Sequence, residues 1–363
     1  MAKQLLSRDP LVFAHMLKLV ALCPDFSAMK AKTRHVISGA AAKADARVES
    51  ISIHDLDHIV FRVSAEEGLW EPDMLLRLHS LFHRLEARRL AHEGGELEAI
   101  SKRLRSVSHI ATDTQYVPAS NAWQIQREEL YESPEHLNVN HLPIELGDIF
   151  QRTGGTSEKC YVLLAQPCDL MVRTNGKRQP ELEYLVLAEV VRASQDSPYA
   201  REMEYYGVSP DDRWFVKLKQ THHVPCCVLD LCVFDGNGQA TITVGGSSPE
   251  GLRPAWEARF EKLQRVYARL LMQLDTVLSP IQGKPAKVKQ VKDRIMAGFV
   301  RELMPKGPFR GSLSQENNRV TVTYNCQRIG RVCRTRAFDI LMGYTSCLSR
   351  PALDRDFGRP LGR

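Results

Sequence analysis

The sequence of 363 residues contains no apolar run that approaches the roughly 18 residues a membrane-spanning helix needs. The apolar stretch 11–23 is interrupted by His15 and Lys18, and its apolar residues recur at helical spacing. We therefore expect an amphipathic helix in this stretch and no signal peptide. This pattern favours a protein without a membrane partner.

Paired cysteine spacings are also absent. The nine cysteines are odd in number and scattered, which favours reduced thiols over a disulfide framework and predicts a cytoplasmic location. No C-x2-C pair of the kind that binds structural zinc is present. A zinc site built from His222, His223 and the cysteines at 160–232 is the less favoured alternative. The neighbours Cys226 and Cys227 would point to opposite faces of a strand, which indicates strand packing.

Nucleotide-binding and catalytic signatures are missing as well. The sequence has no G-x-x-x-x-G-K-[ST] loop, no G-x-G-x-x-G after a strand and no G-x-S-x-G elbow. We found no internal repeat and no low-complexity segment. The sequence therefore predicts no cofactor, and no motif in it specifies a reaction.

Positive charge is concentrated in the last third of the chain. Residues 251–363 hold 22 Lys and Arg against 9 Asp and Glu, a net of +13. Residues 1–250 hold 27 basic and 34 acidic side chains, a net of −7. A basic region of this density is typical of a surface that binds a polyanion or an acidic protein partner. Docking onto the acidic part of the same chain, or simple solvation, would also explain it.

The residue patterns change twice along the chain and predict an α+β protein. We expect a helical domain at 1–110 and a linker at 111–143. Residues 144–250 contain short strand-like runs separated by turns rich in Gly, Asn and Asp, which predicts a small antiparallel β-barrel domain. Residues 251–363 are predicted to form a basic, helical or winged C-terminal domain with a long amphipathic helix at 252–278.

The individual elements follow from local periodicity. In the first domain we expect a short strand at 59–63 and helices at 11–22, 29–46, 73–92 and 96–108. Strands are expected in the barrel at 144–150, 160–166, 182–191, 214–219, 226–234 and 240–244. In the last domain a basic loop at 284–292 leads into a helix ending near 304, followed by a strand at 319–325, a helix at 335–348 and a tail at 353–363.

Eight basic side chains of the last domain are candidate phosphate contacts, since each such contact adds a salt-dependent affinity for nucleic acid. They fall into two clusters, one before and one after the predicted strand at 319–325: Lys284, Lys287, Lys289, Lys292, Arg328, Arg331, Arg334 and Arg336.

Cys168 and Asp169 follow the apolar strand at 160–166, where a nucleophile can be held exposed. His222 or His223 would then act as the base. A reactive thiolate needs a neighbouring cation or a helix N-terminus, and the sequence next to Cys168 offers Asp169 instead. Cysteine is also among the most buried residue types, so packing is the simpler role.

His54 and His58 are spaced i, i+4, and on a helix they would share a face that can hold a divalent metal. His79 and His83 repeat the spacing on the next predicted helix. Histidines beside an apolar stripe are the simpler explanation, so the prediction is no metal, with His54 and His58 as candidates.

Leu-Gly-Asp-Ile-Phe at 146–150 and Tyr-Val-Leu-Leu-Ala-Gln at 161–166 resemble the opening of the small toxin barrels of the PemK/MazF family. The resemblance covers about 25 of the 363 residues. It implies a related barrel, a bacterial protein and an RNA-cleaving site. Family members cleave RNA with an arginine and a hydroxyl residue at these positions, and neither is in place in this chain. In this chain Lys159-Cys160 replaces their Arg-Pro pair, and the second strand ends in Gln166-Pro167-Cys168.

Three functions follow from these patterns. The leading hypothesis is a non-catalytic binding or regulatory protein that engages nucleic acid or an acidic partner, and it requires the basic side chains of 284–336 to share one exposed face. The second is an enzyme acting on nucleic acid, such as a toxin-like ribonuclease, with its site in the barrel. The third is an assembly subunit that forms an oligomer or complex through 252–278, with Trp256, Phe260 and Tyr267 exposed in the monomer.

Overall fold

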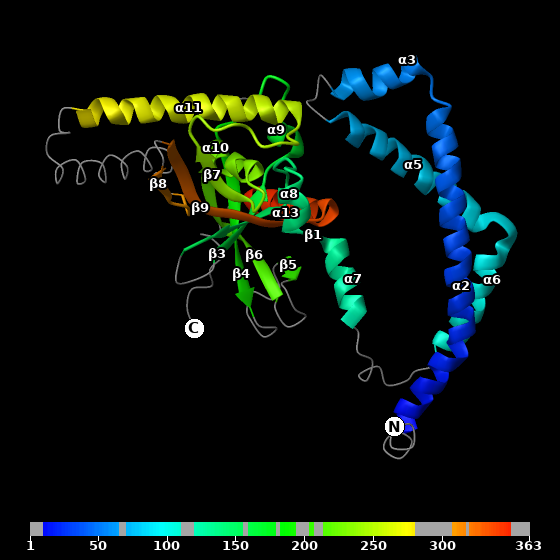
Figure 1. Ribbon diagram of the computed structural model, residues 1–363. Coiled ribbons are helices and arrows are strands. Elements are labelled where there is room, and N and C mark those ends of the chain that lie inside the picture. Colours follow the sequence, from blue (N-terminus) through cyan, green and yellow to red (C-terminus); the bar gives the residue numbers. More distant parts are fainter. Residues whose placement is uncertain are drawn as a thin grey trace, which may run out of the picture. The chain divides into compact units, whose positions relative to one another are not determined.

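A computed structural model describes residues 10–64, 70–109, 120–154, 159–178, 182–193, 203–206, 213–279, 307–316 and 319–349. The chain divides into two compact units, Met1–Ser120 and Asn121–Arg363, hereafter the helical unit and the sheet unit. Figure 1 shows helices in the first and a mixture of helices and strands in the second. The predicted division into three domains and a linker differs from this, because the expected boundary at 250 falls inside the sheet unit.

The helical unit begins with α2, Pro10–Glu49, a single helix of 40 residues where the sequence predicts two. Pro24 lies inside it and is exposed, so the helix continues past a residue that cannot donate a backbone hydrogen bond. Two short helices follow, α3 at Ile53–Leu56 and the π-helix η1 at Asp57–Arg62. The predicted strand at 59–63 is wrong. Its β-branched and aromatic residues favour a strand locally, but no strand pairs with them among the described residues, and the backbone bonds within the helix instead.

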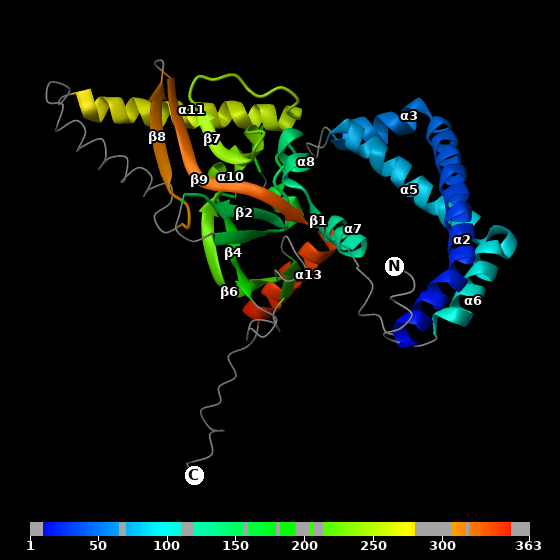
Figure 2. The same cartoon turned by 60° about the horizontal axis from the view of Figure 1, so that its bottom comes forward.

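Helices α5, Glu71–His92, and α6, Glu96–Ser108, confirm two predicted helices. Between them the 3-10 turn η2, Glu93–Gly95, contains two glycines with positive φ angles of 76° and 65°, a conformation that favours glycine. Both helices run antiparallel to α2 (Figures 1 and 2). The contacts that show this direction are Asp45 with His79, Lys32 with Glu96, and Asp25 with Arg103.

Among the described residues, one helix is long and apolar enough to cross a membrane. It is α2, which lies near the N-terminus, and only 11% of its most apolar 18-residue segment is buried. Core helices of soluble proteins and signal sequences can have the same length and composition. The structure thus contains one weak candidate for a membrane helix in the described chain.

The sheet unit is built around an antiparallel sheet of nine strands in the described chain. The strands are β1 (Tyr131–Glu132), β2 (Asp148–Arg152), β3 (Lys159–Leu164), β4 (Tyr184–Ala193), β5 (Met203–Tyr206), β6 (Arg213–Pro225), β7 (Gln239–Thr243), β8 (Gly311–Glu316) and β9 (Arg319–Val332). Their main order is β1-β9-β2-β3-β4-β6-β5, with β7 and β8 also pairing with β9. The described strands form an open sheet and not the predicted closed barrel, because β1 and β5 end the order without pairing with each other.

Strand β9 explains why the C-terminal section belongs to this unit. It has 14 residues, twice the length predicted from the pattern at 319–325, and it pairs with β1, β2, β7 and β8. Its buried residues alternate with partly exposed ones from Val322 to Gly330. The chain therefore returns to insert β9 between β1 and β2, strands that come much earlier in the sequence, and inspection of the local sequence does not reveal this.

Helices pack against this sheet, and short helices follow two of its strands. The segment predicted as a linker contains α7, Ser120–Leu130, and α8, Pro134–Val139. Short helices follow β3 and β6: α9 at Pro167–Leu170, and α10 at Cys226–Asp230 with the 3-10 turn η4 at Leu231–Phe234. The long α11, Pro254–Leu278, and α13, Arg334–Leu348, confirm predicted helices.

The strand predicted at 226–234 is wrong, since α10 and η4 occupy those residues. Pro225 precedes them with φ near −57°, which suits the residue before a helix. Eight of the nine residues are buried, Cys227 being the one that is partly exposed. A helix buried on all sides has no polar face, so its sequence cannot be distinguished from a buried strand by periodicity.

Forty buried apolar residues form one core in the sheet unit, contributed by the sheet, α10, η4, α11 and α13. In the helical unit three buried residues form a cluster, Leu22, Ile100 and Leu104, with Met29 and Val107 packed against them. Four more apolar residues are buried elsewhere in the described part of this unit: Val36, Ala40, Ala44 and Val60. The described parts of the two units therefore differ greatly in how much apolar surface they enclose.

Candidate functional site

Arg328 and Arg331 lie inside the sheet unit, so the prediction that they belong to an exposed phosphate-binding face is wrong. Arg328 is 0% exposed and Arg331 4%. Arg328 donates from Nε to Asn138 Oδ1 at 2.7 Å and from Nη2 to the Leu137 carbonyl oxygen at 3.1 Å. Asp148 accepts a hydrogen bond from Arg331 Nε at 2.5 Å and lies 3.5 Å from Arg328 Nη1.

This buried network has a structural reason. A guanidinium removed from water is stable only with charged and hydrogen-bonded partners, and Asp148 with nearby carbonyl groups supplies them. Burial lowers the pKa of Arg328 despite the attraction of Asp148. Burial also acts to lower the pKa of Arg331, but Asp148, Glu145 and Glu132 outweigh it and raise that pKa. Both arginines therefore link β9 to Asp148 at the start of β2 and to the segment 137–143 that precedes it. Their guanidinium groups are buried and are not available to bind a phosphate.

The other predicted phosphate contacts divide into two groups. Arg334 is exposed at the start of α13, with its guanidinium carbon 5.8 Å from the centroid of the Phe338 ring, and Arg336 is partly buried two residues further on. Residues two apart on a helix point to different sides of it. Lys284, Lys287, Lys289 and Lys292 lie outside the described residues. The described chain therefore brings none of these six side chains together on one face.

Cys168 and Asp169 lie on α9, where Cys168 is exposed. The Cys168 thiol lies 3.6 Å from Gln166 Oε1 and 3.6 Å from Asp169 Oδ1. Both neighbours are hydrogen-bond acceptors, and neither supplies the cation that an activated cysteine needs beside it. The local geometry supports a thiol that closes a short turn.

The two candidate bases lie on β6. His222 pairs with Leu187 and His223 with Val186 across the β4 ladder, so their side chains point to opposite faces of the sheet. His222 contacts the buried Tyr161, with ring centroids 5.4 Å apart and the rings at 89°. Burial, followed by the charge of Glu189, raises the pKa of Tyr161 to about 12, so this phenol stays protonated at neutral pH. These contacts make His222 a packing partner of Tyr161, and His223 is exposed on the opposite face.

The residues considered for metal do not gather in the described chain. His54 and His58 are both exposed, on α3 and η1. No group of three or more His, Cys, Asp or Glu side chains within reach of one ion occurs among the described residues. Burial raises the pKa of Cys226 to about 12 and that of Cys227 to about 11, which keeps both thiols protonated and disfavours metal ligation.

Helix α11 directs its aromatic side chains into the core of its own unit. Trp256 is 2% exposed and Phe260 7%, and the Tyr267 hydroxyl lies 3.3 Å from that of Tyr324 on β9. The hypothesis of an interface along this helix requires these aromatic residues to be exposed, and that condition is not met. The helix is amphipathic because it covers the sheet (Figure 1).

A different helix exposes apolar side chains. Of the 21 large apolar side chains exposed in the described chain, 14 belong to the helical unit. Eight lie on α2, with Val20 the most exposed at 70%, and we call them the α2 apolar surface: Leu11, Phe13, Met16, Leu17, Leu19, Val20, Phe26 and Ile37. They lie on more than one side of the helix, and exposed apolar groups gathered on a helix commonly mark sites of association.

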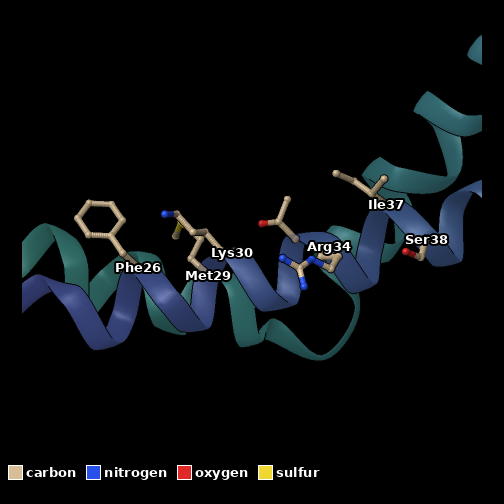
Figure 3. Close-up of a pocket in the computed structure, with 7 residues that line it drawn as sticks. Phe26, Met29, Lys30, Arg34, Ile37 and Ser38 are labelled. Carbon is tan, nitrogen blue, oxygen red and sulfur yellow. The ribbon is translucent and has the colours of Figure 1, made fainter. Parts of the chain in front are cut away.

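A shallow pocket of about 430 Å³ lies on one side of α2, beside the part of this surface around Phe26 and Ile37. Figure 3 shows the side chains that border it along one side of the helix. Its lining combines apolar groups with two cations: Phe26, Met29, Lys30, Arg34, Ile37 and Ser38. The pocket is therefore an apolar depression with positive charge at one edge.

The sequence itself indicates that α2 carries apolar side chains on more than one side, although the helical spacing suggests a single stripe. Spacing predicts one apolar stripe, but residues 11–20 carry apolar side chains on several sides of the helix. Leu22 faces the core, whereas Phe13, Met16 and Val20 lie on the opposite side at i, i+3 and i+7. A helix apolar on two faces needs two partners, and α6 provides only one.

No family model matches the chain, and no curated protein and no solved structure is significantly similar to it.

Proposed function

We propose that this protein is a non-catalytic, cytoplasmic assembly subunit whose helical unit binds another protein through the α2 apolar surface. The proposal is carried by one observation: 14 of the 21 exposed large apolar side chains of the described chain lie in the helical unit, in which only seven apolar residues are buried. Surfaces of this kind mark sites of protein association. The sheet unit, with its large core, is then the folded body that the helical unit recruits into a complex.

The candidate catalytic residues of the described chain make contacts that favour packing roles over catalysis. Cys168 has acceptor neighbours, and His222 packs on Tyr161, so the described geometry supports no nucleophile with a base. The Gly-Asp-Ile segment that resembles toxin barrels places Asp148 in a buried ion pair with Arg331. An RNA-cleaving function remains a prediction from that resemblance.

The test is site-specific photo-crosslinking of the full chain in cells. We expect a photoreactive amino acid at Val20 to form covalent adducts with protein, because this side chain would be buried in the complex. The same amino acid at Met272, which is also 70% exposed but lies on α11, serves as the matched control and should form few. Equal adduct yields at the two positions would contradict the proposal.

Polyanion binding is the second candidate, favoured by the net charge of +13 on residues 251–363. Arg328 and Arg331 are engaged internally, so we expect Lys284, Lys287, Lys289 and Lys292 to carry any such binding. Replacing these four lysines with Ala should abolish retention on labelled DNA or RNA at about 50 mM salt, where phosphate contacts are strong. Wild-type protein that binds neither nucleic acid at this salt concentration would rule the second candidate out.

A further inference from the structure

We propose that the sheet unit binds a small ligand with a dianionic phosphate group through Arg152, Lys159 and Tyr161, where strand β2 ends and strand β3 begins. The site lies in the sheet unit, so it is independent of the assembly function proposed for the helical unit. It is also distinct from the candidate lysines of 284–292, which lie outside the described residues.

Two cations face each other across β2 and β3. Arg152, the last residue of β2, pairs directly with Lys159, the first residue of β3. Directly opposed residues of an antiparallel pair share a face, with Cβ atoms about 4.5–5.5 Å apart, and like charges in this position destabilise the pair. Both side chains are partly buried, and neither forms an ion pair within the described chain. Two adjacent positive charges therefore have no counter-charge of their own in the part of the protein that the structure describes.

Tyr161 supplies a hydroxyl group on the same face, two residues beyond Lys159 on β3. This residue is 1% exposed, and its hydroxyl group has no hydrogen-bond partner among the described residues. Buried polar groups in native proteins rarely lack a partner, so the hydroxyl group is an unused donor. Burial and then Glu189 raise the pKa of this phenol, whereas Arg152 acts to lower it, which places the positive charge of Arg152 near the phenol.

The Tyr161 ring is held from two sides. The ring centroid of Phe309 lies 5.5 Å away with the rings at 81°, and that of His222 lies 5.4 Å away with the rings at 89°. Aromatic pairs favour this edge-to-face arrangement. Because two such contacts fix the ring, the hydroxyl group is positioned before a ligand arrives, and binding costs little side-chain entropy at this residue.

The carboxylate on this face is already paired. Strands β3, β4 and β6 lie side by side (Figure 1), with Glu189 of β4 opposite Tyr161 and Lys217 of β6 opposite Glu189. Lys217 Nζ lies 3.6 Å from Glu189 Oε1. With Arg152 and Lys159, these charged side chains are three cations against one carboxylate, a net of +2.

The charge and the donors of the site match one chemical group. A phosphomonoester carries about −1.5 to −2 charges at neutral pH and has three strong acceptor oxygens. The guanidinium group of Arg152 can bind two of these oxygens as a fork, Lys159 adds a point charge, and the Tyr161 hydroxyl group donates one hydrogen bond. A carboxylate, or one phosphodiester of a nucleic acid, carries a single negative charge and would neutralise only half of the site.

The test is isothermal titration calorimetry of the full chain with phenyl phosphate and, separately, with inorganic phosphate at constant ionic strength. We expect saturable binding with one site per chain, tighter for phenyl phosphate if the natural ligand is a phosphomonoester and tighter for inorganic phosphate if it is the free ion. Arg152→Ala, Lys159→Ala and Tyr161→Phe should each weaken binding by about tenfold, the loss expected for a hydrogen bond to a charged group. Tyr161→Phe removes the hydroxyl group and keeps the ring that packs on Phe309.

The matched controls are Arg319→Ala, at an exposed position of β9, and Tyr184→Phe, at a position of β4 that is 44% exposed. Both should bind like wild type. Wild-type protein that binds neither probe would overturn the proposal, as would Arg152, Lys159 and Tyr161 variants that bind as tightly as the controls. A single-stranded oligonucleotide that binds through Arg152 and Lys159 when neither small probe does would also overturn it and would assign these cations to nucleic acid.

Thermal unfolding without ligand separates a binding role from a structural one. If Arg152 served only to stabilise the fold, Arg152→Ala would lower the Tm of the ligand-free protein. We expect the Tm of this variant to equal or exceed that of wild type, because the change removes the repulsion with Lys159. Saturating phosphate should raise the Tm of wild type and leave that of the variant unchanged. A lower Tm without ligand, together with an unchanged response to phosphate, would show a structural role and contradict the proposal.

Discussion

Asp230 carries the ionic contacts of two arginines in the interior of the sheet unit. Arg178 donates to it through two bonds of 2.7 and 2.9 Å, and Arg259 donates from Nε at 2.8 Å. Burial raises the pKa of Asp230, but the charges and hydrogen bonds of Arg178 and Arg259 outweigh burial and hold it below its ordinary value. This triad joins the loop after α9, the end of α10 and the first turns of α11.

Asp230→Asn should destabilise the sheet unit by about 3–5 kcal/mol, because it leaves two guanidinium groups near a neutral side chain in a buried site. Urea unfolding followed by tryptophan fluorescence measures the change. Asp339→Asn, on the exposed side of α13, is the control and should shift the free energy of unfolding by less than about 0.5 kcal/mol. A similar effect for both variants would contradict the structural role of the triad.

The same residue predicts a pH dependence. Its pKa is lower in the folded state than the ordinary value of about 3.9 expected in the unfolded chain. The stabilisation is therefore fully present above about pH 4 and is lost as the pH falls through the folded-state pKa. The difference in stability between wild type and Asp230→Asn should accordingly shrink below about pH 4.

At the scale of single elements, α2 contains a proline in its interior, a position where proline destabilises a helix. Pro24 interrupts the backbone hydrogen bonds of a 40-residue helix, and α2 curves along its length (Figure 1). Helix packing on α5 and α6 maintains the helix through this residue. Local propensity alone predicts a break there, which is why the sequence indicates two helices.

Pro24→Ala should raise the stability of the helical unit by on the order of 1–3 kcal/mol, since Ala restores a hydrogen bond and removes a steric clash. Thermal unfolding followed by circular dichroism at 222 nm measures the change. Pro254→Ala, at the first residue of α11 where a proline costs little, is the control and should have a small effect. A decrease for Pro24→Ala would mean that packing on α6 depends on the bend.

At the scale of the whole molecule, the two units bury very different numbers of apolar residues, forty-two in the sheet unit against seven in the helical unit of the described chain. A unit with so little enclosed surface is marginal by itself and gains stability from association. We therefore expect the helical unit to be the less stable of the two.

We expect urea unfolding in two steps, with the helical unit unfolding first. The first step, followed by circular dichroism, should have the lower urea midpoint, because the helical unit encloses much less apolar surface than the sheet unit. The second step should be reported by Trp214 and Trp256, which are buried in the sheet unit. A single transition seen at the same urea concentration by both probes would contradict the independent unfolding of the two units.

Local pattern determined the elements whose stabilising contacts are near in sequence. Helices α5, α6, α11 and α13 follow from apolar spacing and end signals, and several strands of the sheet follow from short apolar runs between turns. The mixed α+β class and the amphipathic character of α11 also follow from the sequence. The separation of charge between residues 1–250 and 251–363 is a property of the sequence alone.

Tertiary structure decided which of these residues face water. The arginines of β9 look like a basic surface in the sequence, but the strand has partner strands on both sides, and Arg328 and Arg331 are paired with Asp148 inside. The residues of α10 and η4 look like a strand, because complete burial removes the polar face that would reveal a helix. The apolar side chains of α2 look like a core stripe, but the described unit has only one helix thickness to cover them. Burial depends on distant parts of the chain, and local periodicity carries no information about them.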